Sequence, residues 1–468
     1  MSTGMMRLGG LLAAVSIAAA LQTPVAAETD RPALREAMAR YQTNDPQNQV
    51  APADPAKKGK MYGFIARAMA GEQISTVQTG IAESPTPTGA TRPRQAGEHF
   101  RIASITKTMT SIVVLQLVAE GKLRLSDSIE KWLPGAVKGC NIFYVHGSLC
   151  FDANKITIRD VLGHTSGLYS YTADPGFMAG IGLDIMGARK TTYAPADLLR
   201  TAVKHGPNFR PDLPPCADHP TDPKKKCSPA AKERFEYSNT NYVALSMIIK
   251  AVTGRTHSEE ITTRIIQRLG LTGTSMPGAD TTLPQPHAVH YSGQLMPGHP
   301  LGIWEATNLN PTMGPGTGDA ISTTADLLTY LRAWTRGGLL PPAMMTEMRT
   351  LHPVWVEDQE DLAYRYGEQG EDVVYGVREV WARYGLGITQ RTFTCPGGGD
   401  PVTVWGHNGA IPGSMSYAYV TEDGSRGLAV NLNGDWPGKP HPTETGKYEP
   451  NELVMLYDLL RAEFCAPA

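Results

Sequence analysis

The sequence of 468 residues carries no charge imbalance and few aromatic residues. Its 43 basic residues are matched by 45 acidic ones, so nothing in the charge points to nucleic acid or an anionic membrane as a partner. Only 7% of the residues are aromatic, whereas 48 glycines and 36 prolines predict many turns and long loops. His287 and His290 are three residues apart but have no acidic residues nearby. We therefore expect neither a metal site nor a cofactor.

Cysteine is also scarce, with six residues and none before Cys140. This position excludes lipid attachment at a cysteine that follows a signal peptide. The spacing is irregular and contains no Cys-x-x-Cys, which argues against a zinc site. Six cysteines instead fit an exported protein with three disulfides, although the sequence alone does not fix their connectivity. Local spacing suggests the pairs Cys140–Cys150 and Cys216–Cys227, each closing a loop.

The chain has no hydrophobic run long enough to span a bilayer comfortably. The apolar run from Leu8 to Leu21 is about 14 residues long, whereas a spanning helix needs about 20. Arg7 precedes this run and small residues follow it before Glu28, which is the order of a secretory signal. An uncleaved anchor is the alternative. We expect a signal peptide over residues 1–27 and a periplasmic or secreted mature chain without a membrane span.

The most informative positive feature is a serine, Ser104, three residues before a lysine, Lys107. Both lie where an apolar helix is predicted to begin, which would run to Glu120 and stop at Gly121. Residues three apart share a helical face, a buried lysine gives up its proton readily, and a hydroxyl needs such a partner to become a nucleophile. Taken alone, the pattern more often marks a capping serine and a surface lysine. Apolar residues almost all round the helix, however, predict a buried central helix.

Two further motifs follow in order. Tyr237 and Asn239 flank Ser238 just before an apolar helix, and His407-Asn408-Gly409 ends an apolar run, Val402 to Trp405, that reads as a strand. Each motif alone is more typical of a turn. Together, and with matching flanks from about residue 60 to 465, they resemble the serine penicillin-recognising hydrolases. The nearest branch holds the secreted D-Ala-D-Ala carboxypeptidases, class C β-lactamases, D-aminopeptidases and related esterases.

The resemblance implies an α+β fold, in which an antiparallel sheet flanked by helices meets an all-helical lobe at the active-site cleft. Strand patterns near both ends of the chain agree with one shared sheet. We expect an N-terminal helix and polar linker over 28–59 and a hydrolase domain over 60–468, with disulfide-pinned insertions near 138–152 and 206–230. The family also suggests a third disulfide, Cys395–Cys465. The Cys216–Cys227 loop is either a surface excursion or a limit on substrate size.

Roles in the site follow from the same resemblance. Ser104 is the expected nucleophile, and Lys107 and Tyr237 form the proton-handling pair, with the base left open between them. Asn239 would bind Lys107 or a substrate amide, and His407 would be the basic residue of the strand that lines the cleft. Gly409 would admit the acyl chain. The backbone N–H groups of Ser104 and Ala410 would form the oxyanion hole.

The substrate is less clear, because the chain departs from the carboxypeptidase pattern. Thr389 stands where those enzymes tend to carry an arginine for a terminal carboxylate, and Asn408 and Ala410 replace hydroxyl residues. Arg391 shares a strand face with Thr389 and is a candidate substitute, the alternative being a surface arginine. Carboxypeptidase activity is therefore in question, whereas serine-hydrolase chemistry is not.

The sequence thus predicts a monomeric serine hydrolase that forms an acyl-enzyme. Its expected substrates are small peptides of cell-wall type that contain D-residues, with β-lactams as acylating mimics. The enzyme alternatives are a class C-like β-lactamase and a promiscuous carboxylesterase. A non-enzyme alternative is a protein that senses wall fragments or β-lactams, although a sensor would not need all four of Ser104, Lys107, Tyr237 and His407.

Overall fold

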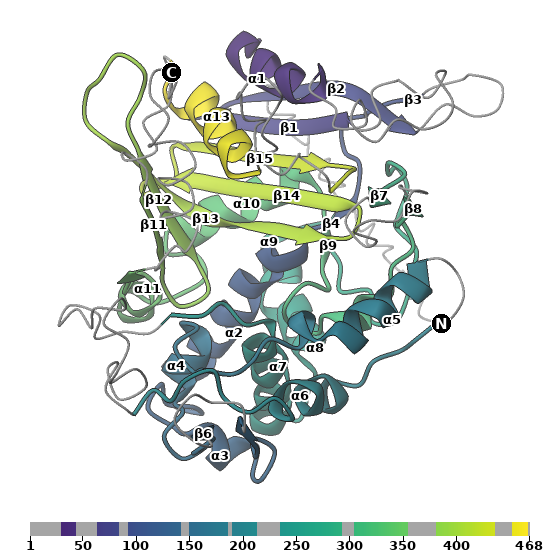
Figure 1. Cartoon of the computed structure of the whole chain (residues 1–468). Helices are drawn as coiled ribbons and strands as arrows, with labels where there is room; N and C mark the ends of the chain where they lie inside the picture. The colour runs from purple at the N-terminus through teal and green to yellow at the C-terminus, as the bar shows by residue number, and fades with distance from the viewer. Residues whose placement is uncertain are drawn as a thin grey trace, which may run out of the picture.

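Strands from both ends of the chain pair in one antiparallel sheet of nine strands, as computed in a structural model (Figure 1). The order is β10-β11-β12-β13-β14-β15-β1-β2-β3, so β1 lies between β15 and β2. The structure describes residues 30–43, 63–83, 92–141, 149–185, 190–212, 235–292, 304–353, 381–435 and 452–466. The strands of this sheet are β1 (Gly63–Ala70), β2 (Gln73–Glu83), β3 (Arg92–Pro93), β10 (His352–Pro353), β11 (Trp381–Tyr384), β12 (Thr389–Phe393), β13 (Val402–Ile411), β14 (Ser414–Thr421) and β15 (Arg426–Leu432).

The helices cover both faces of the sheet and form a lobe beside it (Figure 1). They are α1 (Pro32–Thr43), α2 (Thr106–Ala119), α3 (Ile129–Trp132), α4 (Ile158–Leu162), α5 (Pro175–Ile185), α6 (Pro195–Val203), α7 (Asn239–Thr253), α8 (His257–Ile261), α9 (Gln267–Leu269), α10 (Thr324–Thr335), α11 (Pro342–Met348) and α13 (Glu452–Phe464). Short two-stranded pairs join β4 (Phe100–Arg101) to β9 (Ile321–Ser322), β5 (Cys140–Asn141) to β6 (Leu149–Cys150), and β7 (Tyr291–Ser292) to β8 (Trp304–Glu305). The expected α+β architecture is confirmed.

Alternation along the central strands assigns each side chain to one of two cores. In β13, Val404 packs into the core under α1 and α13, whereas Trp405 packs into the core shared with α2 and α10. Successive side chains of a strand point to opposite faces, so a strand buried on both faces reads as a continuous apolar run. The two terminal helices are joined by a hydrogen bond of 2.5 Å from the Tyr41 hydroxyl to Asp458.

Helix α2 runs through the middle of the molecule. Twelve of its residues are buried, and its apolar residues contact both the sheet and the helical lobe. A 3-10 turn, η3 (Ala103–Ile105), leads into the helix, and Gly121 follows its end with a positive φ of 70°. Glycine adopts this left-handed conformation at little cost, which is how helices commonly end. The predicted helix, with its end near Glu120, is confirmed.

Two of the expected disulfides are present. Cys140 bonds to Cys150 across the β5–β6 pair, and Cys395 bonds to Cys465 just beyond α13. Cys216 and Cys227 lie outside the described residues, as do the expected signal segment and most of the expected linker. None of the described helices is long and apolar enough to cross a membrane.

Candidate active site

The three sequence motifs meet where the sheet borders the helical lobe. Ser104 lies in the 3-10 turn η3, Lys107 in the first turn of α2, and Asn239 at the first turn of α7. His407 lies on β13. An added Cβ on Gly409 would clash with the carbonyl oxygen of Ile102 and lie 3.0 Å from the backbone nitrogen of Ser104. Glycine therefore allows β13 to pass directly against the turn that carries the serine.

Lys107 is fully buried, and its side-chain nitrogen contacts three of the groups that form the site. Its Nζ lies 2.9 Å from Ser104 Oγ, 2.7 Å from Asn239 Oδ1 and 3.0 Å from the carbonyl oxygen of Thr317. The Thr317 hydroxyl donates a further hydrogen bond of 2.8 Å to Asn239 Oδ1. The Asn239 amide group donates in turn to the hydroxyl of Thr172 at 3.0 Å. This network fixes the lysine relative to the serine.

Burial shifts the protonation of both proton-handling residues toward their neutral forms. It lowers the pKa of Lys107 well below its usual value, against a smaller opposing effect of Asp319. It raises the pKa of the Tyr237 phenol, against a smaller opposing effect of the Ser104 hydroxyl. Desolvation disfavours whichever form is charged. Burial therefore favours a neutral amine and a neutral phenol at this site.

His407 is buried on β13 and uncharged. Its Nδ1 faces the carbonyl oxygen of Asn408, an acceptor, and its Nε2 lies 3.0 Å from the Tyr384 hydroxyl. The proton must therefore be on Nδ1, and Tyr384 donates to Nε2. Burial, followed by the nearby Lys107, lowers the pKa of His407 to about 3. The ring at the family's basic position thus offers no positive charge here.

The substrate role expected for Thr389 and Arg391 is wrong. Thr389 pairs with Gly406 in the sheet, so its side chain lies on the face opposite to that of His407. Arg391 lies on that same far face, where its guanidinium donates to the hydroxyls of Tyr419 at 2.9 Å and Tyr457 at 3.1 Å. It is buried beneath α13 rather than placed at a substrate carboxylate. It is not a surface arginine either.

The strand β13 extends beyond the apolar run that predicts it. It continues past Trp405 to Ile411, so the whole His-Asn-Gly motif lies within the strand on which His407 was expected. Asn408 pairs with Tyr417, and alternation places its side chain on the face away from His407. Asn408 therefore serves the site through its carbonyl oxygen.

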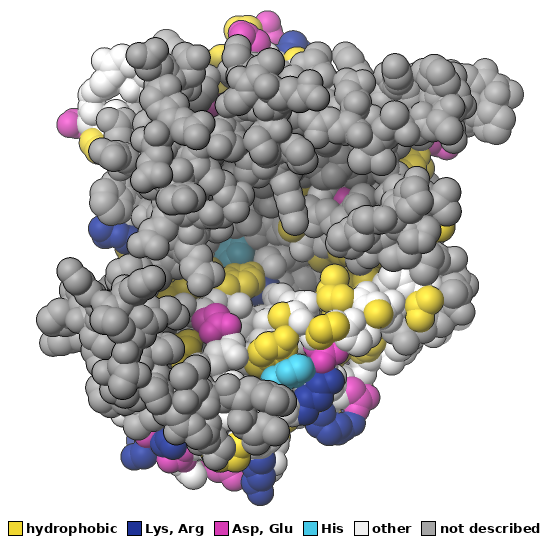
Figure 2. Space-filling model, viewed as in Figure 1, with side chains coloured by type: hydrophobic (Ala, Val, Ile, Leu, Met, Phe, Trp, Pro, Cys, Tyr) yellow, Lys and Arg dark blue, Asp and Glu magenta, His cyan; other side chains and the backbone are white. Residues whose placement is uncertain are grey.

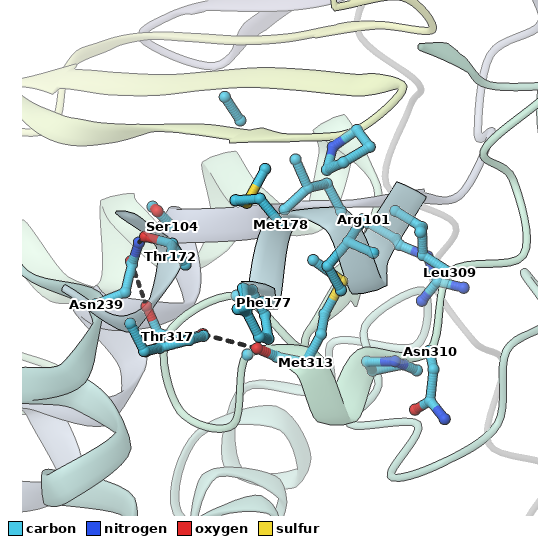
Figure 3. Close-up of a pocket in the computed structure, with 18 residues that line it drawn as sticks. Arg101, Ser104, Thr172, Phe177, Met178, Asn239, Leu309, Asn310, Met313 and Thr317 are labelled. Carbon is cyan, nitrogen blue, oxygen red and sulfur yellow. Dashed lines mark hydrogen bonds between the residues drawn. The ribbon is translucent and has the colours of Figure 1, made fainter. Parts of the chain in front are cut away.

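A cavity of about 240 Å³ opens beside Ser104 and Ala410 (Figure 3). Most of its wall is apolar, formed by side chains from α5, from the 3-10 turn η6 (Pro311–Met313) and the segment before it, and from the end of β13 and the residue after it: Phe177, Met178, Ile181, Leu309, Met313, Ile411 and Pro412. In Figure 2, hydrophobic side chains gather beside the central hollow. Met178 on α5 is 39% exposed. The cavity therefore suits an apolar group next to the serine.

Arg101 also lines this cavity, and it is 4% exposed. Its Nη2 donates to the carbonyl oxygens of Thr281 at 2.6 Å and Thr307 at 3.4 Å. Its Nε and Nη1 have no hydrogen-bond partner among the described residues. Burial lowers the pKa of Arg101 to about 10, which still leaves it charged at neutral pH. Among the described residues, no cluster of three or more His, Cys, Asp or Glu could hold a metal ion.

Four residues of the site were not found from the sequence: His164, Thr172, Thr317 and Tyr384. The useful part of Thr317 is its backbone carbonyl, which no side-chain pattern reveals. It stands in the stretch of alternating glycines, Gly314 to Gly318, and these glycines were the available signal. The ring centroid of His164 lies 4.3 Å from that of Tyr237.

Comparison with known proteins decides the family. The model of the Beta-lactamase family matches residues 63–447. The chain belongs to the Beta-lactamase family. Together with the fold and the Ser104–Lys107 pair, this membership makes the protein a serine hydrolase.

Relatives of this β-lactamase-family hydrolase are known both as sequences and as structures. The chain is 24% identical over 321 residues to penicillin-binding protein 4* of Bacillus subtilis, covering 66% of this chain and 60% of that protein's length. It is 25% identical to penicillin-binding protein 4 of Amycolatopsis lactamdurans, with 72% of each chain covered. The crystal structure of a D-stereospecific amidohydrolase from Streptomyces sp. is similar with a TM-score of 0.67 and 32% identity, covering 94% of this chain and 100% of that one. D-amino acid amidase from Ochrobactrum anthropi SV3 shares the fold, with a TM-score of 0.63, 20% identity, and coverage of 92% of this chain and 97% of that one.

Proposed function

We propose that this hydrolase cleaves amide bonds of small D-residue-containing peptides through an acyl-enzyme on Ser104. The observation that carries the proposal is the buried Lys107 Nζ, held 2.9 Å from Ser104 Oγ by two other acceptors. The Streptomyces amidohydrolase, at 32% identity over nearly the whole chain, supports D-stereospecific substrates. The uncharged His407 and the apolar cavity support an amide with an apolar side chain.

The hydrogen bonds of Lys107 favour it as the base. The Asn239 Oδ1 and the Thr317 carbonyl are acceptors, so they take two N–H groups of the amine. The lone pair of a neutral amine then faces Ser104 and accepts its proton as Oγ attacks the substrate carbonyl carbon. The neutral phenol of Tyr237 serves as the proton donor to the departing amine.

The proposed reaction has two steps, acylation and deacylation of Ser104. In the first, the Oγ–C bond forms and the C–N bond breaks, and the leaving amine takes the proton originally on Ser104 through the Lys107–Tyr237 pair. In the second, water attacks the acyl-enzyme, which releases the carboxylic acid and restores the Ser104 hydroxyl. The backbone N–H groups of Ser104 and Ala410, which both line the cavity, are the proposed donors to the oxyanion.

The position of the scissile bond follows from the charges of the cleft. Thr389 and Arg391 lie on the far face of the sheet, so neither of them places a cation where a carboxypeptidase of this family would hold a terminal carboxylate. We therefore favour amides and amino-end or internal bonds over the release of a C-terminal D-alanine. Arg101 is the one described cation that lines the cavity, and it is the feature that favours the alternative of a carboxypeptidase.

One substrate series tests both possibilities. An apolar D-residue amide, its L-enantiomer, and a D-Ala-D-Ala peptide with either a free or an amidated C-terminus are incubated with wild type and Ser104→Ala. We expect turnover of the D-amide, little of the L-amide, and no preference for the free carboxylate. A strong preference for the free carboxylate that is lost in Arg101→Gln, with folding intact, would establish the carboxypeptidase instead.

Acylation by β-lactams is a separate part of the proposal. Intact mass measured against time after the addition of a penicillin should show one adduct on wild type and none on Ser104→Ala. A long-lived adduct fits a peptidase, whereas rapid decay with hydrolysed drug fits a class C-like β-lactamase. Absence of any adduct, with D-amide turnover present, would reject this part and leave an amidase whose cleft excludes β-lactams.

We further propose that the protein is exported. Two disulfides are typical of the periplasm or the extracellular space rather than of a reducing cytosol. N-terminal sequencing of the protein from the periplasm or medium should find Glu28 or a neighbouring residue at the start. A chain that retains residues 1–27 in the soluble cell fraction would contradict the proposal.

A further inference from the structure

His164 lies in a backbone conformation that side chains rarely adopt. Its φ is +60°, and the only other described non-glycine residue with positive φ is Ala103, which precedes the nucleophile. Such conformations are strained and persist only where the surrounding structure holds them. Both strained residues therefore lie beside the proposed catalytic groups, although His164 is fully buried and takes no part in the proton transfers described above.

His164 packs against the rings of Tyr242 and Tyr384, and three of its contacts fall on the segment that carries Tyr237. Its carbonyl oxygen accepts a hydrogen bond of 2.9 Å from the backbone N–H of Glu236, and its Nδ1 accepts one of 3.1 Å from the backbone N–H of Ser238. Its ring lies against the ring of Tyr237, with centroids 4.3 Å apart. The residues before and after Tyr237 and the phenol ring itself are thus all held by this one residue.

The protonation state of His164 is set by these contacts. Nδ1 also accepts a hydrogen bond of 2.9 Å from the Asn241 amide, whose oxygen accepts from the Ser166 hydroxyl at 2.6 Å. Two donors on Nδ1 require that it carry no proton, so the proton is on Nε2, which has no partner among the described residues. Burial keeps the pKa of His164 well below its usual value. The ring therefore stays neutral, and the hydrogen bonds to it persist.

We propose that His164 is a positioning residue that clamps Tyr237 for proton transfer to the leaving group. The clamp consists of the two backbone hydrogen bonds and the ring contact. It acts through Tyr237 and touches neither substrate nor Ser104. This inference rests on the proposed role of Tyr237, and it predicts that damage to the clamp matters most for substrates whose leaving group needs a proton.

His164→Asn is the most informative variant. The asparagine side-chain oxygen can replace Nδ1 as an acceptor, and asparagine tolerates positive φ better than other residues, so the fold should survive while the ring contact is lost. We expect kcat/KM on a D-residue anilide to fall on the order of 100-fold, the loss typical of a small misplacement of a catalytic group. Turnover of an activated ester, whose leaving group needs no proton, should fall far less.

A double-mutant cycle separates positioning from mere stabilisation. If His164 acts through Tyr237, then His164→Asn should change the anilide rate less than about threefold when Tyr237→Phe is already present, because the effects of coupled residues do not add. An equal loss in both backgrounds, or an equal loss on ester and anilide, would overturn the proposal. His290→Asn is the matched control, since His290 is also a buried imidazole (2% exposed) but has its Nδ1 hydrogen bond to Gly413.

A spectroscopic measurement that needs no turnover tests the clamp independently of the proposed function. With 3-fluorotyrosine at position 237, 19F NMR of otherwise wild-type protein should give one sharp signal, and His164→Asn should broaden or split it. An unchanged signal would overturn the clamp even if the enzyme hydrolyses D-amides. Conversely, a wild type that hydrolyses no substrate but shows this change would reject the proposed function and retain the clamp.

Discussion

Replacement of Lys107 by methionine tests the central group of the site. Methionine keeps most of the buried apolar volume but removes the Nζ that contacts Ser104 Oγ, Asn239 Oδ1 and the Thr317 carbonyl. General-base catalysis contributes about 10²- to 10⁴-fold to a rate, and the serine loses its only described basic neighbour within hydrogen-bond distance. We therefore expect kcat/KM on a D-residue amide to fall by about 10³-fold or more.

The same change should not destabilise the protein at neutral pH. Asn239 Oδ1 keeps the hydrogen bond from the Thr317 hydroxyl, so the main loss is at the Thr317 carbonyl, a cost of about 1–3 kcal/mol. Against this, the variant no longer has to give up on folding the proton that lysine carries in the unfolded chain, a cost of up to about 1.4 kcal/mol for each unit between the solution pH and the unfolded pKa of about 10.4. The free energy of unfolding of Lys107→Met should thus equal or exceed that of wild type.

The pH dependence makes this comparison specific. An unfolded lysine has a pKa of about 10.4, and burial lowers the pKa of Lys107 well below its usual value. Between these two pKa values, the unfolded chain binds a proton that the native protein lacks. The stability of wild type relative to Lys107→Met therefore rises with pH through this window, by at most about 1.4 kcal/mol per pH unit.

Denaturant unfolding of both proteins at pH 7 and pH 10, together with amide turnover, checks the reasoning. The advantage of the variant in unfolding free energy should shrink toward pH 10. Because the two proteins are compared at the same pH, the titration of the groups that they share cancels. A Lys107→Met protein that keeps activity within tenfold of wild type would refute the assignment of the base. A stability difference that is independent of pH would refute the neutral lysine.

Three further outcomes follow from other contacts. Gly409→Val should abolish acyl transfer in kinetic assays because a side chain there clashes with Ile102, and retention of wild-type kcat/KM would contradict that packing. Replacement of both Cys395 and Cys465 by serine should lower the unfolding free energy by about 2–5 kcal/mol. It should leave kcat unchanged, since Cys465 packs in the core under α13, on the face of the sheet opposite to α2; denaturation curves that coincide with wild type would be evidence against this stabilisation. Burial lowers the pKa of His407 to about 3, below the value of about 6.5 in the unfolded chain, so its stabilising effect is present above pH 6.5 and is lost as the pH falls toward 3. Wild type should therefore lose stability between pH 6.5 and 4 more steeply than His407→Gln, and parallel curves in thermal unfolding would argue against the buried neutral ring.

The serine–lysine pair could be predicted because its geometry is local. Three-residue spacing fixes the relation of Ser104 to Lys107 on one helix, whatever the helix packs against. Their relation to Asn239 and His407 is not local, and only the resemblance to a family supplied it. The hairpin of β14 and β15 is local in the same sense, because strand alternation and a turn signal such as Glu422-Asp423-Gly424 are properties of neighbouring residues.

Arg391 shows that a local sequence pattern does not predict on which face of the sheet a side chain lies. Strand periodicity correctly put Arg391 and Thr389 on one face, but it cannot say which face that is. The choice is made by pairing with Gly406 and Val404 on β13, and a shift of one residue in that register would have turned Arg391 toward the cleft. The tyrosine hydroxyls that hold the guanidinium come from β14 and α13, so the decision depends on segments well separated along the chain.

The two strained residues show a different limit. Nothing in the types of residues 103 and 164 predicts positive φ, because alanine and histidine both prefer other conformations and glycine is the residue that sequence reasoning expects there. Local preference and final structure disagree at these positions because β13 and the Tyr237 segment hold them from outside. Disagreement of this kind is expected where a protein places reactive groups, since strain is kept only when packing or function requires it. Ala103 sets the direction of Ser104, and His164 sets that of Tyr237. The Ser104 hydroxyl and the Tyr237 phenol, which exchange protons with Lys107 in the proposed mechanism, are thus each oriented by a non-glycine residue with positive φ.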